Sequence, residues 1–402
     1  MASFVSCIFA IVAMIPLIQS TFYNEKKTLN QLASFIKSSH YLSFGKQCQS
    51  FEKQFAKWQG RKYGVLVNSG SSANLAIIQS LLNLHLLKRG DAVGFSAITW
   101  STNVMPLIQL GLQPVPIDIE LDTLNISSQN LQHTLKTSKI KALFITNLLG
   151  FCDDIDRIAQ ICQDNKILLI EDNCESLGSI YKGKKLGNYG LASTVSFYVG
   201  HHMSTIEGGA VVTDNSALAE MLNLVRAHGW DRNLSFAKQE KLRKRFEVNS
   251  TFYSRYTFYD LGYNLRPTEI TGFLGKLQLT YLDQIIKKRQ DNFLYFAKYL
   301  YTNERYYPLR YAHMDLVSNF AVPLICTSKK IREHIVKNCD GKVEIRPIVG
   351  GNMVSQPFMK KYTDLKELCP NATIIHDQGL YFGNNPDLTR KNMTRLKDLF
   401  LS

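Results

Sequence analysis

The sequence lacks closely spaced cysteines, internal repeats and low-complexity linkers. Its eight cysteines lie far apart, and none forms a C-x-x-C pair, which argues against a zinc ribbon and against a disulfide-rich secreted domain. We therefore expect reduced, mostly buried thiols and predict no metal site. With 402 residues, 45% hydrophobic and 20% charged, the chain has the composition of an ordinary enzyme and enough core for more than one domain.

A convincing membrane-spanning run is also missing. Residues 3–17 are largely apolar, but no basic residue precedes them and Pro16 interrupts the run, so they fit a signal peptide or a membrane anchor poorly. We predict a cytoplasmic protein in which residues 1–14 form an apolar extension. Export or membrane anchoring is the alternative.

Concentrated charge of one sign is scarce as well. The formal net charge is +14, yet Lys and Arg are scattered, and residues 238–245, KQEKLRKR, form the one dense basic run. A solvent-exposed helix face explains that run, so we predict no nucleic-acid partner. Anionic nucleotide-sugar substrates also suit a basic protein.

Short apolar runs alternate with helical patterns between residues 60 and 215. The runs cover residues 63–67, 92–98, 115–119, 142–146, 167–170, 194–198 and 210–213. Near-continuously apolar strands separated by helix-length segments predict an α/β domain, with helices on both faces of a mainly parallel sheet. Helices at 217–226 and 270–300 follow, and the tail predicts a smaller α+β domain. We expect a large domain over residues 15–275 and a small one over 276–402.

Residues 68–74, NSGSSAN, follow the first strand and open a helix. Such a turn presents backbone N–H groups and hydroxyls to a phosphate, here from Gly70, Ser71 and Ser72. Helix capping without a ligand is the alternative interpretation.

Residues 170–175, IEDNCE, end another apolar run. Asp172 and Glu175 are therefore expected at the carboxyl end of a strand, where open α/β sheets bind their ligands. A carboxylate there can keep a pyridinium nitrogen protonated and make the ring an electron sink. A helix N-cap is the alternative for either acid.

The segment SFYVGHH at residues 196–202, followed by EGG at 207–209, carries the most information. Together with the two motifs above, its order and spacing resemble the DegT/DnrJ/EryC1/StrS sugar aminotransferases, which are fold-type I pyridoxal-phosphate enzymes with an aspartate aminotransferase-like fold. In that family a lysine in this stretch binds the cofactor covalently. The matching position here is His201, which resembles the branch that removes the 3-hydroxyl of nucleotide-linked 4-keto-6-deoxyhexoses.

The chemistry of the histidine agrees with that branch. Without a lysine the enzyme cannot hold the aldehyde covalently, so we expect bound pyridoxamine phosphate, exchanging with pyridoxal phosphate. His201 then acts as base at the cofactor and as acid toward the departing hydroxyl. The alternative is an inactive protein in which His201 fills space, and we expect His202 to be a packing residue.

Further segments extend the resemblance. It implies that Trp100 stacks on the cofactor ring, that Ser196 contacts its phosphate and that Asn264 reaches the phosphate site of a partner subunit in a homodimer with shared active sites. Arg346 and Asn352 belong to segments that resemble the substrate-binding part of the small domain.

The resemblance also narrows the substrate. One dehydratase subgroup acts on CDP-sugars and holds a cysteine-ligated iron–sulfur cluster, but here no cysteine lies between Cys174 and Cys326, so we predict no cluster. Glu175, where related aminotransferases usually have glutamine, is similar to the subgroup that acts on GDP-4-keto-6-deoxymannose with glutamate as amino donor, toward sugars such as colitose. The alternatives are a CDP-4-keto-6-deoxyglucose dehydratase-like enzyme, a nucleotide-sugar aminotransferase, and a non-catalytic protein that binds the cofactor or a nucleotide sugar.

Overall fold

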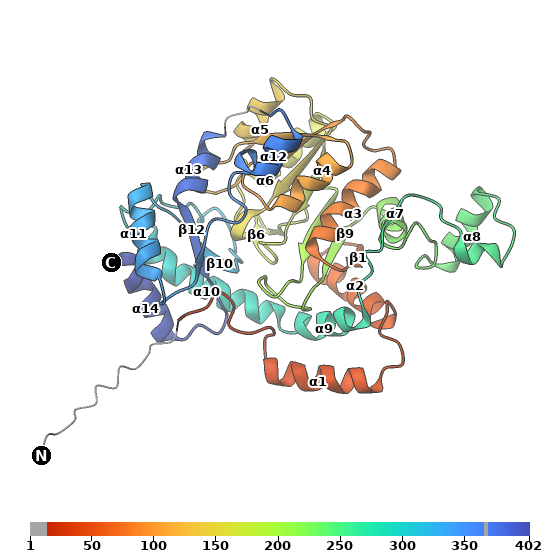
Figure 1. The fold of residues 1–402 in the computed structure, drawn as a ribbon, viewed down its shortest axis with the longest axis horizontal. Coiled ribbons are helices and arrows are strands. Elements are labelled where there is room, and N and C mark those ends of the chain that lie inside the picture. Colours follow the sequence, from red (N-terminus) through yellow and green to blue (C-terminus); the bar gives the residue numbers. More distant parts are fainter. Residues whose placement is uncertain (1–13, 366–368) are drawn as a thin grey trace, which may run out of the picture.

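The computed structural model describes residues 14–365 and 369–402 (Figure 1). Its centre is a seven-stranded sheet in the order β1-β9-β8-β5-β4-β2-β3. Only β9 runs antiparallel to its neighbours β1 and β8, whereas the remaining pairs are parallel. The mainly parallel sheet predicted from the sequence is confirmed. Its strands are β1 (Tyr63–Val67), β2 (Ala92–Ser96), β3 (Gln113–Ile117), β4 (Ala142–Thr146), β5 (Leu168–Asp172), β8 (Ala192–Ser196) and β9 (Gly209–Thr213).

Successive side chains of a strand point to opposite faces of the sheet, and here the side chains on both faces are apolar. In β4, Ala142 and Phe144 pack on the side of α3 (Gly70–Asn83) and α7 (Ser216–Arg226), while Leu143 and Ile145 pack on the opposite side. Helices cover that second side as well: α2 (Lys46–Gln59), α5 (Ser128–Leu135) and α6 (Ile155–Asp164). The continuous apolar runs of the sequence thus arise from strands buried on both faces.

The helix predicted at 270–300 is two helices. α9 (Glu269–Leu279) ends before Thr280, and α10 (Leu282–Leu300) begins after Tyr281. The predicted division after residue 275 falls inside α9. α10 then links the two parts, because Ile286 packs beside α2, whereas Phe296 contacts Phe382 in the C-terminal sheet.

The C-terminal part contains the three-stranded antiparallel sheet β10-β12-β11, formed by β10 (Ala321–Ile325), β11 (Ile345–Arg346) and β12 (Gly379–Gly383). This is the α+β architecture expected for the tail. Its helices are α11 (Lys329–Cys339), α12 (Pro357–Tyr362), α13 (Pro370–Gln378) and α14 (Arg390–Leu401). Other elements are α1 (Glu25–Ser38), α4 (Met105–Gln109), the short hairpin β6 (Ile180–Tyr181) and β7 (Lys184–Lys185), and the 3-10 turns η1 (Ser101–Asn103), η2 (Leu148–Gly150) and η4 (Met353–Ser355).

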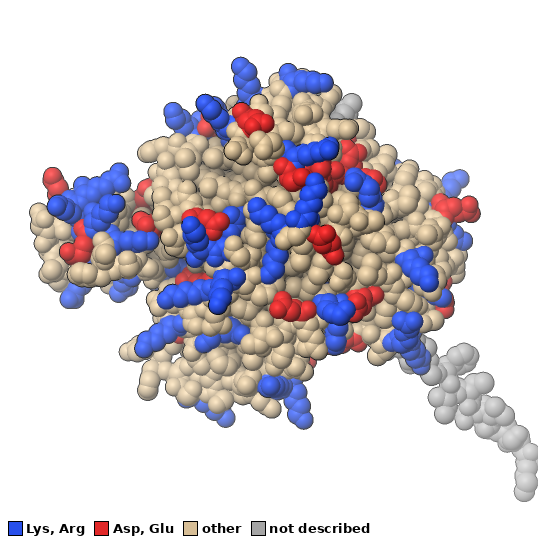
Figure 2. Space-filling model, turned by 180° about the vertical axis from the view of Figure 1, so that it is seen from behind, with Lys and Arg blue, Asp and Glu red and all other residues tan. Residues whose placement is uncertain are grey.

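An arm projects from the body of the molecule and carries α8 (Phe236–Arg245) and η3 (Tyr253–Tyr256), at the right of Figure 1. No residue of α8 is buried, which confirms that the basic run forms an exposed helix face. The arm also exposes Phe252, Tyr253 and Tyr256. Figure 2 shows Lys and Arg dispersed among Asp and Glu over the rest of the visible face.

Within residues 14–365 and 369–402, no helix is both long and apolar enough to cross a membrane. The predicted N-terminal extension lies almost entirely in residues 1–13, outside the described residues. Of the seven cysteines in the described part, all except Cys174 are buried, as expected for mostly buried thiols.

Candidate functional site

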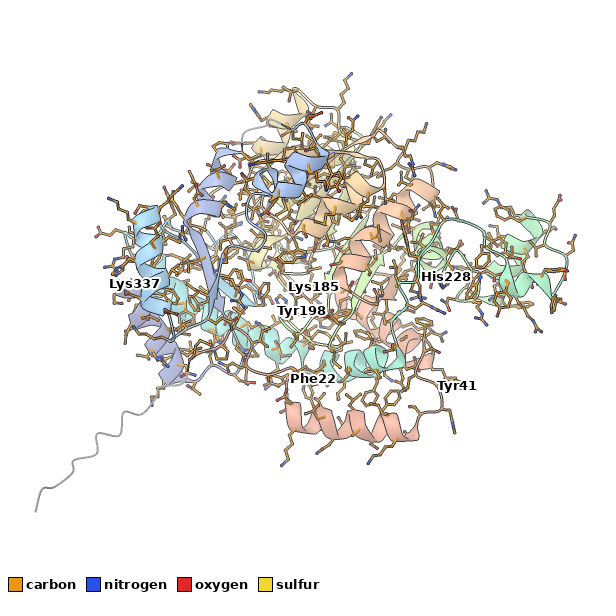
Figure 3. All side chains as sticks on the ribbon, in the orientation of Figure 1. Phe22, Tyr41, Lys185, Tyr198, His228 and Lys337 are labelled. Atoms are coloured by element: carbon orange, nitrogen blue, oxygen red, sulfur yellow. The ribbon has the colours of Figure 1, made fainter. Side chains whose placement is uncertain are left out.

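A cavity of about 480 Å³ opens at the carboxyl ends of β5 and β8, where the C-terminal part meets the large sheet. Figure 3 places Tyr198, which lines it, near the centre of the molecule between the two parts. Open α/β sheets bind ligands at this edge. The lining comprises Leu17, Ile18, Ser69, Gly70, Ser71, Asn74, Trp100, Thr102, Asn103, Thr146, Asp172, Cys174, Glu175, Ser196, Tyr198, Gly200, His201, Glu207, Phe320, Glu344, Arg346, Val349 and Tyr381.

Asp172 is the last residue of β5, and its side chain is held from three directions. The amide groups of Asn74 and Asn103 donate to its Oδ2 at 3.0 and 2.7 Å, and the backbone N–H of Cys174 donates to its Oδ1 at 2.9 Å. Asp172 is 4% exposed. The carboxylate therefore has a fixed orientation at the base of the cavity.

The N-terminus of α3 forms another wall. Ser69 caps the helix by accepting a hydrogen bond from the backbone N–H of Ser72 at 3.0 Å. A Cβ atom on Gly70 would lie 2.7 Å from the Cβ of Ser196, so glycine allows the helix to approach β8. The free N–H groups at this end favour an anion.

Glu175 is 7% exposed and accepts one hydrogen bond, from the backbone N–H of Leu149 at 3.1 Å. Leu149 has φ of 50°, a left-handed conformation that is strained for a leucine. Burial, with a smaller contribution from the nearby Asp172, raises the pKa of Glu175 to about 8. Glu175 is therefore protonated at neutral pH and can donate a hydrogen bond into the cavity.

His201 follows β8 in the loop that closes the cavity. Its ring packs edge-on against Phe320, with ring centres 5.2 Å apart, and its buried Nδ1 has no partner among the described residues. Burial and, more weakly, the positive charge of Arg289 lower the pKa of His201 to about 4, against the opposing effect of Asp172. The imidazole is therefore neutral at physiological pH and available to accept a proton.

The neighbouring His202 is not among the residues that line this cavity. It is 2% exposed, and its Nε2 lies 3.1 Å from the carbonyl oxygen of Ser318. This environment agrees with the packing role expected for it.

The structure brings most of the predicted site residues together. Gly70, Ser71, Trp100, Ser196 and Arg346 line the same cavity as Asp172, Glu175 and His201.

Three predicted residues lie outside this lining. The Ser72 hydroxyl donates to the Oδ1 of Asn68, and the exposed Asn264 accepts a hydrogen bond from Arg266 at 2.9 Å. Asn352 is buried, donating to Thr373 and capping η4. Internal hydrogen bonds thus occupy the Asn352 amide, which is not available to a substrate in this cavity.

Sequence reasoning missed several lining residues. Asn74 and Asn103 orient Asp172, yet nothing in their local sequence reveals a partner 98 and 69 residues away. Phe320 and Tyr381 reach the cavity from beside β10 and from β12. Leu17 reaches it because its backbone N–H is held by Glu344 at 2.9 Å, a contact across 327 residues.

The charges of the lining are unusual for such a basic chain. Four acidic residues, Asp172, Glu175, Glu207 and Glu344, face one basic residue, Arg346, which forms an ion pair with Glu344. No lysine lines the cavity in the described part of the chain.

The sheet order, the helix N-terminus and the acid at the end of β5 define the fold of the fold-type I pyridoxal-phosphate-dependent transferases. Residues 23–400 match the model of the DegT/DnrJ/EryC1/StrS aminotransferase family, and the chain belongs to that family. The predictions of fold and family are confirmed.

Individual relatives are similar over nearly the whole chain. The GDP-4-keto-6-deoxy-D-mannose 3-dehydratase of Yersinia pseudotuberculosis is 36% identical over 96% of this chain and 97% of its own. The solved structure of the Escherichia coli enzyme of the same name, with bound hydrated PLP, has a TM-score of 0.86 at 33% identity and covers 96% of this chain and 100% of its own. A structure of GDP-4-keto-6-deoxymannose 3-dehydratase with a trapped PLP–glutamate geminal diamine has a TM-score of 0.87 at 34% identity and covers the same shares.

Proposed function

We propose that this protein is a 3-dehydratase that removes the 3-hydroxyl of GDP-4-keto-6-deoxymannose, using pyridoxamine phosphate and glutamate as amino donor. One observation carries the proposal. His201 faces the cavity of this aminotransferase fold, and none of the described lining residues is a lysine. Relatives of this name, one of them solved with PLP and glutamate together, support the sugar and the amino donor.

The residues present fit the cofactor. Asp172, fixed by Asn74 and Asn103, is suited to hold the ring nitrogen. The N-terminus of α3 at Gly70 and Ser71, with Ser196 opposite, is suited to its phosphate. Trp100, 53% exposed at the rim, offers a stacking surface. When bound, the cofactor supplies an amine that condenses with the 4-keto group and a ring that withdraws electrons.

His201 performs the proton transfers in this proposal. Its neutral imidazole takes a proton from the cofactor's 4′ carbon, and the imidazolium then protonates the departing 3-hydroxyl, which leaves as water. Phe320 limits rotation of the ring through its edge contact. Glu175, protonated at neutral pH, donates a hydrogen bond near the cofactor ring.

We also propose a homodimer with shared active sites. The substrates and the cofactor phosphate are all anionic, yet the described lining has three acids besides the protonated Glu175, and its one arginine is paired with Glu344. Basic groups from a second chain would balance this charge. Asn264 is exposed and follows the arm of α8 and η3 in the chain. Together with Arg266, it is suited to reach the phosphate site of the neighbouring chain.

The test of function is direct. Purified protein is incubated with pyridoxamine phosphate, glutamate and GDP-4-keto-6-deoxymannose, and ammonia and the 3-deoxy product are measured. We expect both in equal amounts. Their absence would refute the proposal for this sugar, and a 4-amino sugar without loss of the 3-hydroxyl would identify an aminotransferase instead.

A further inference from the structure

A second, smaller cavity lies behind the His201 loop. It shares Leu17, Ile18, Gly200, His201 and Phe320 with the main cavity, so this layer separates the two. Arg289, from the middle of α10, lines the rear cavity and is 6% exposed. A buried arginine on the far side of the candidate base is not explained by the function proposed above.

The guanidinium of Arg289 is held by backbone carbonyls. Its Nη2 donates to the carbonyl of His201 at 3.1 Å, its Nη1 donates to the carbonyl of Asn384 at 2.7 Å, and its buried Nε has no partner. The Asn384 amide in turn donates to the carbonyl of Arg289 at 2.8 Å and to the Oδ1 of Asn319 at 2.7 Å. The His201 loop is therefore tied to α10 and, through Asn384, to the C-terminal sheet.

The charge of Arg289 is not neutralised locally. Among the described residues it forms no ion pair, and Asp387, the acid that acts on it electrostatically, is paired with Lys288 at 3.3 Å. Two carbonyl acceptors need only a neutral amide donor, whereas a buried charge without a counter-charge is costly. Holding the His201 loop in place explains the hydrogen bonds of Arg289, but it does not explain why this position carries a positive charge.

We propose that Arg289 is a positioning residue for His201, fixing its backbone through the guanidinium and placing an unpaired positive charge behind its ring. The proposal rests on the proposed function, because it assigns the charge to the base of that reaction. The positive charge disfavours the imidazolium, so the imidazolium that forms on proton transfer is a stronger acid toward the departing 3-hydroxyl.

The pKa of His201 depends on the ionisable groups that surround it. Asp172 favours the imidazolium, whereas Arg289 and burial oppose it. The groups on all surrounding elements are Asp172, Cys174, Glu175, Tyr198, Glu207, Glu344, Arg346 and Tyr381 on the main-cavity side, and Tyr23, His202, Arg289 and Asp387 on the rear side. Arg289 is the single cation on the rear side among the described lining residues.

Two variants separate the charge from the tether. Arg289→Gln keeps neutral donors and removes the charge, whereas Arg289→Lys keeps the charge and removes the forked contact. Deuterium exchange at the C2 position of each histidine, followed by mass spectrometry on the full-length protein, gives the titration midpoint of His201 without any turnover. The same variants are assayed for dehydration as a function of pH.

We expect the midpoint of His201 to rise by about one pH unit in Arg289→Gln and to stay in place in Arg289→Lys. The acid limb of the kcat profile should follow each midpoint, and kcat of the lysine variant should fall about tenfold at unchanged KM. An unchanged midpoint in Arg289→Gln, or equal midpoints in the two variants, would overturn the proposal, as would full kcat in Arg289→Lys. If the wild type does not dehydrate the sugar, the proposed function fails while the exchange measurement still decides the role of Arg289.

Discussion

At the scale of single residues, the site is governed by how burial changes protonation. His201 and Glu175 lie at the same cavity, and burial moves the pKa of His201 down to about 4 and that of Glu175 up to about 8. Both groups are therefore neutral at pH 7 without a bound ligand. A neutral base beside a neutral hydrogen-bond donor suits chemistry that shifts charge onto a cofactor.

Replacing His201 tests its role directly. His201→Asn should reduce dehydration by at least about a hundredfold, because no other neutral base faces the cavity from this loop. His201→Lys should also lose dehydration, and borohydride reduction with pyridoxal phosphate should leave a pyridoxyl adduct on residue 201, detected by peptide mapping. Full activity in either variant would remove His201 from the mechanism.

Glu175→Gln should change how stability depends on pH. The pKa of Glu175 is raised on folding from 4.5 to about 8, so the native state binds the extra proton, and wild-type stability is lost as pH rises through that window. The glutamine variant avoids this loss. Its free energy of unfolding relative to the wild type should therefore increase by about 4 kcal/mol between pH 4.5 and 8. Urea unfolding of both proteins at the two pH values measures it, and a constant difference would contradict the burial effect.

At the scale of elements, the approach of α3 to β8 shapes the proposed phosphate site. A Cβ on Gly209 would lie 2.4 Å from the carbonyl oxygen of Ser69, so glycine is needed on β9 as well as at Gly70. The sequence pattern predicted the turn and the helix, but not which hydroxyls face the cavity. Ser71 lines it, whereas Ser72 turns toward Asn68.

Two substitutions on α3 should differ in effect. Gly70→Ala should weaken pyridoxamine phosphate binding about tenfold, because its Cβ would push the helix away from Ser196. Ser72→Ala, the matched control, should leave affinity within about twofold because its hydroxyl bonds within the protein. Fluorescence titration measures both, and a larger loss for Ser72→Ala would restore the phosphate contact predicted from the sequence.

At the scale of the whole molecule, one chain does not supply the positive charge that the proposed ligands require. The exposed aromatic arm and Asn264 lie outside the described cavity lining. A symmetric dimer would bury the arm and bring these groups to the neighbouring site. Light scattering of the purified protein should give twice the mass of the 45.7 kDa chain.

Mixing two inactive variants tests the shared site. Asn264→Asp should impair the neighbouring phosphate site by adding negative charge, while His201→Asn disables its own chain. A heterodimer of the two has one site with both native residues, so random exchange should recover about a quarter of wild-type activity. No recovery despite demonstrated subunit exchange would show that each chain builds its site alone.

The sequence by itself determined the fold class, the family and the position of His201, because alternating apolar runs and short motifs express local physics that the chain carries in order. The tertiary structure alone decided what surrounds His201. Asn74 and Asn103 reach Asp172, and Arg289 reaches the His201 carbonyl, across 98, 69 and 88 residues. Burial, which neutralises the histidine, arises only when β8, α10 and the segment before β10 pack together, so no local pattern records it.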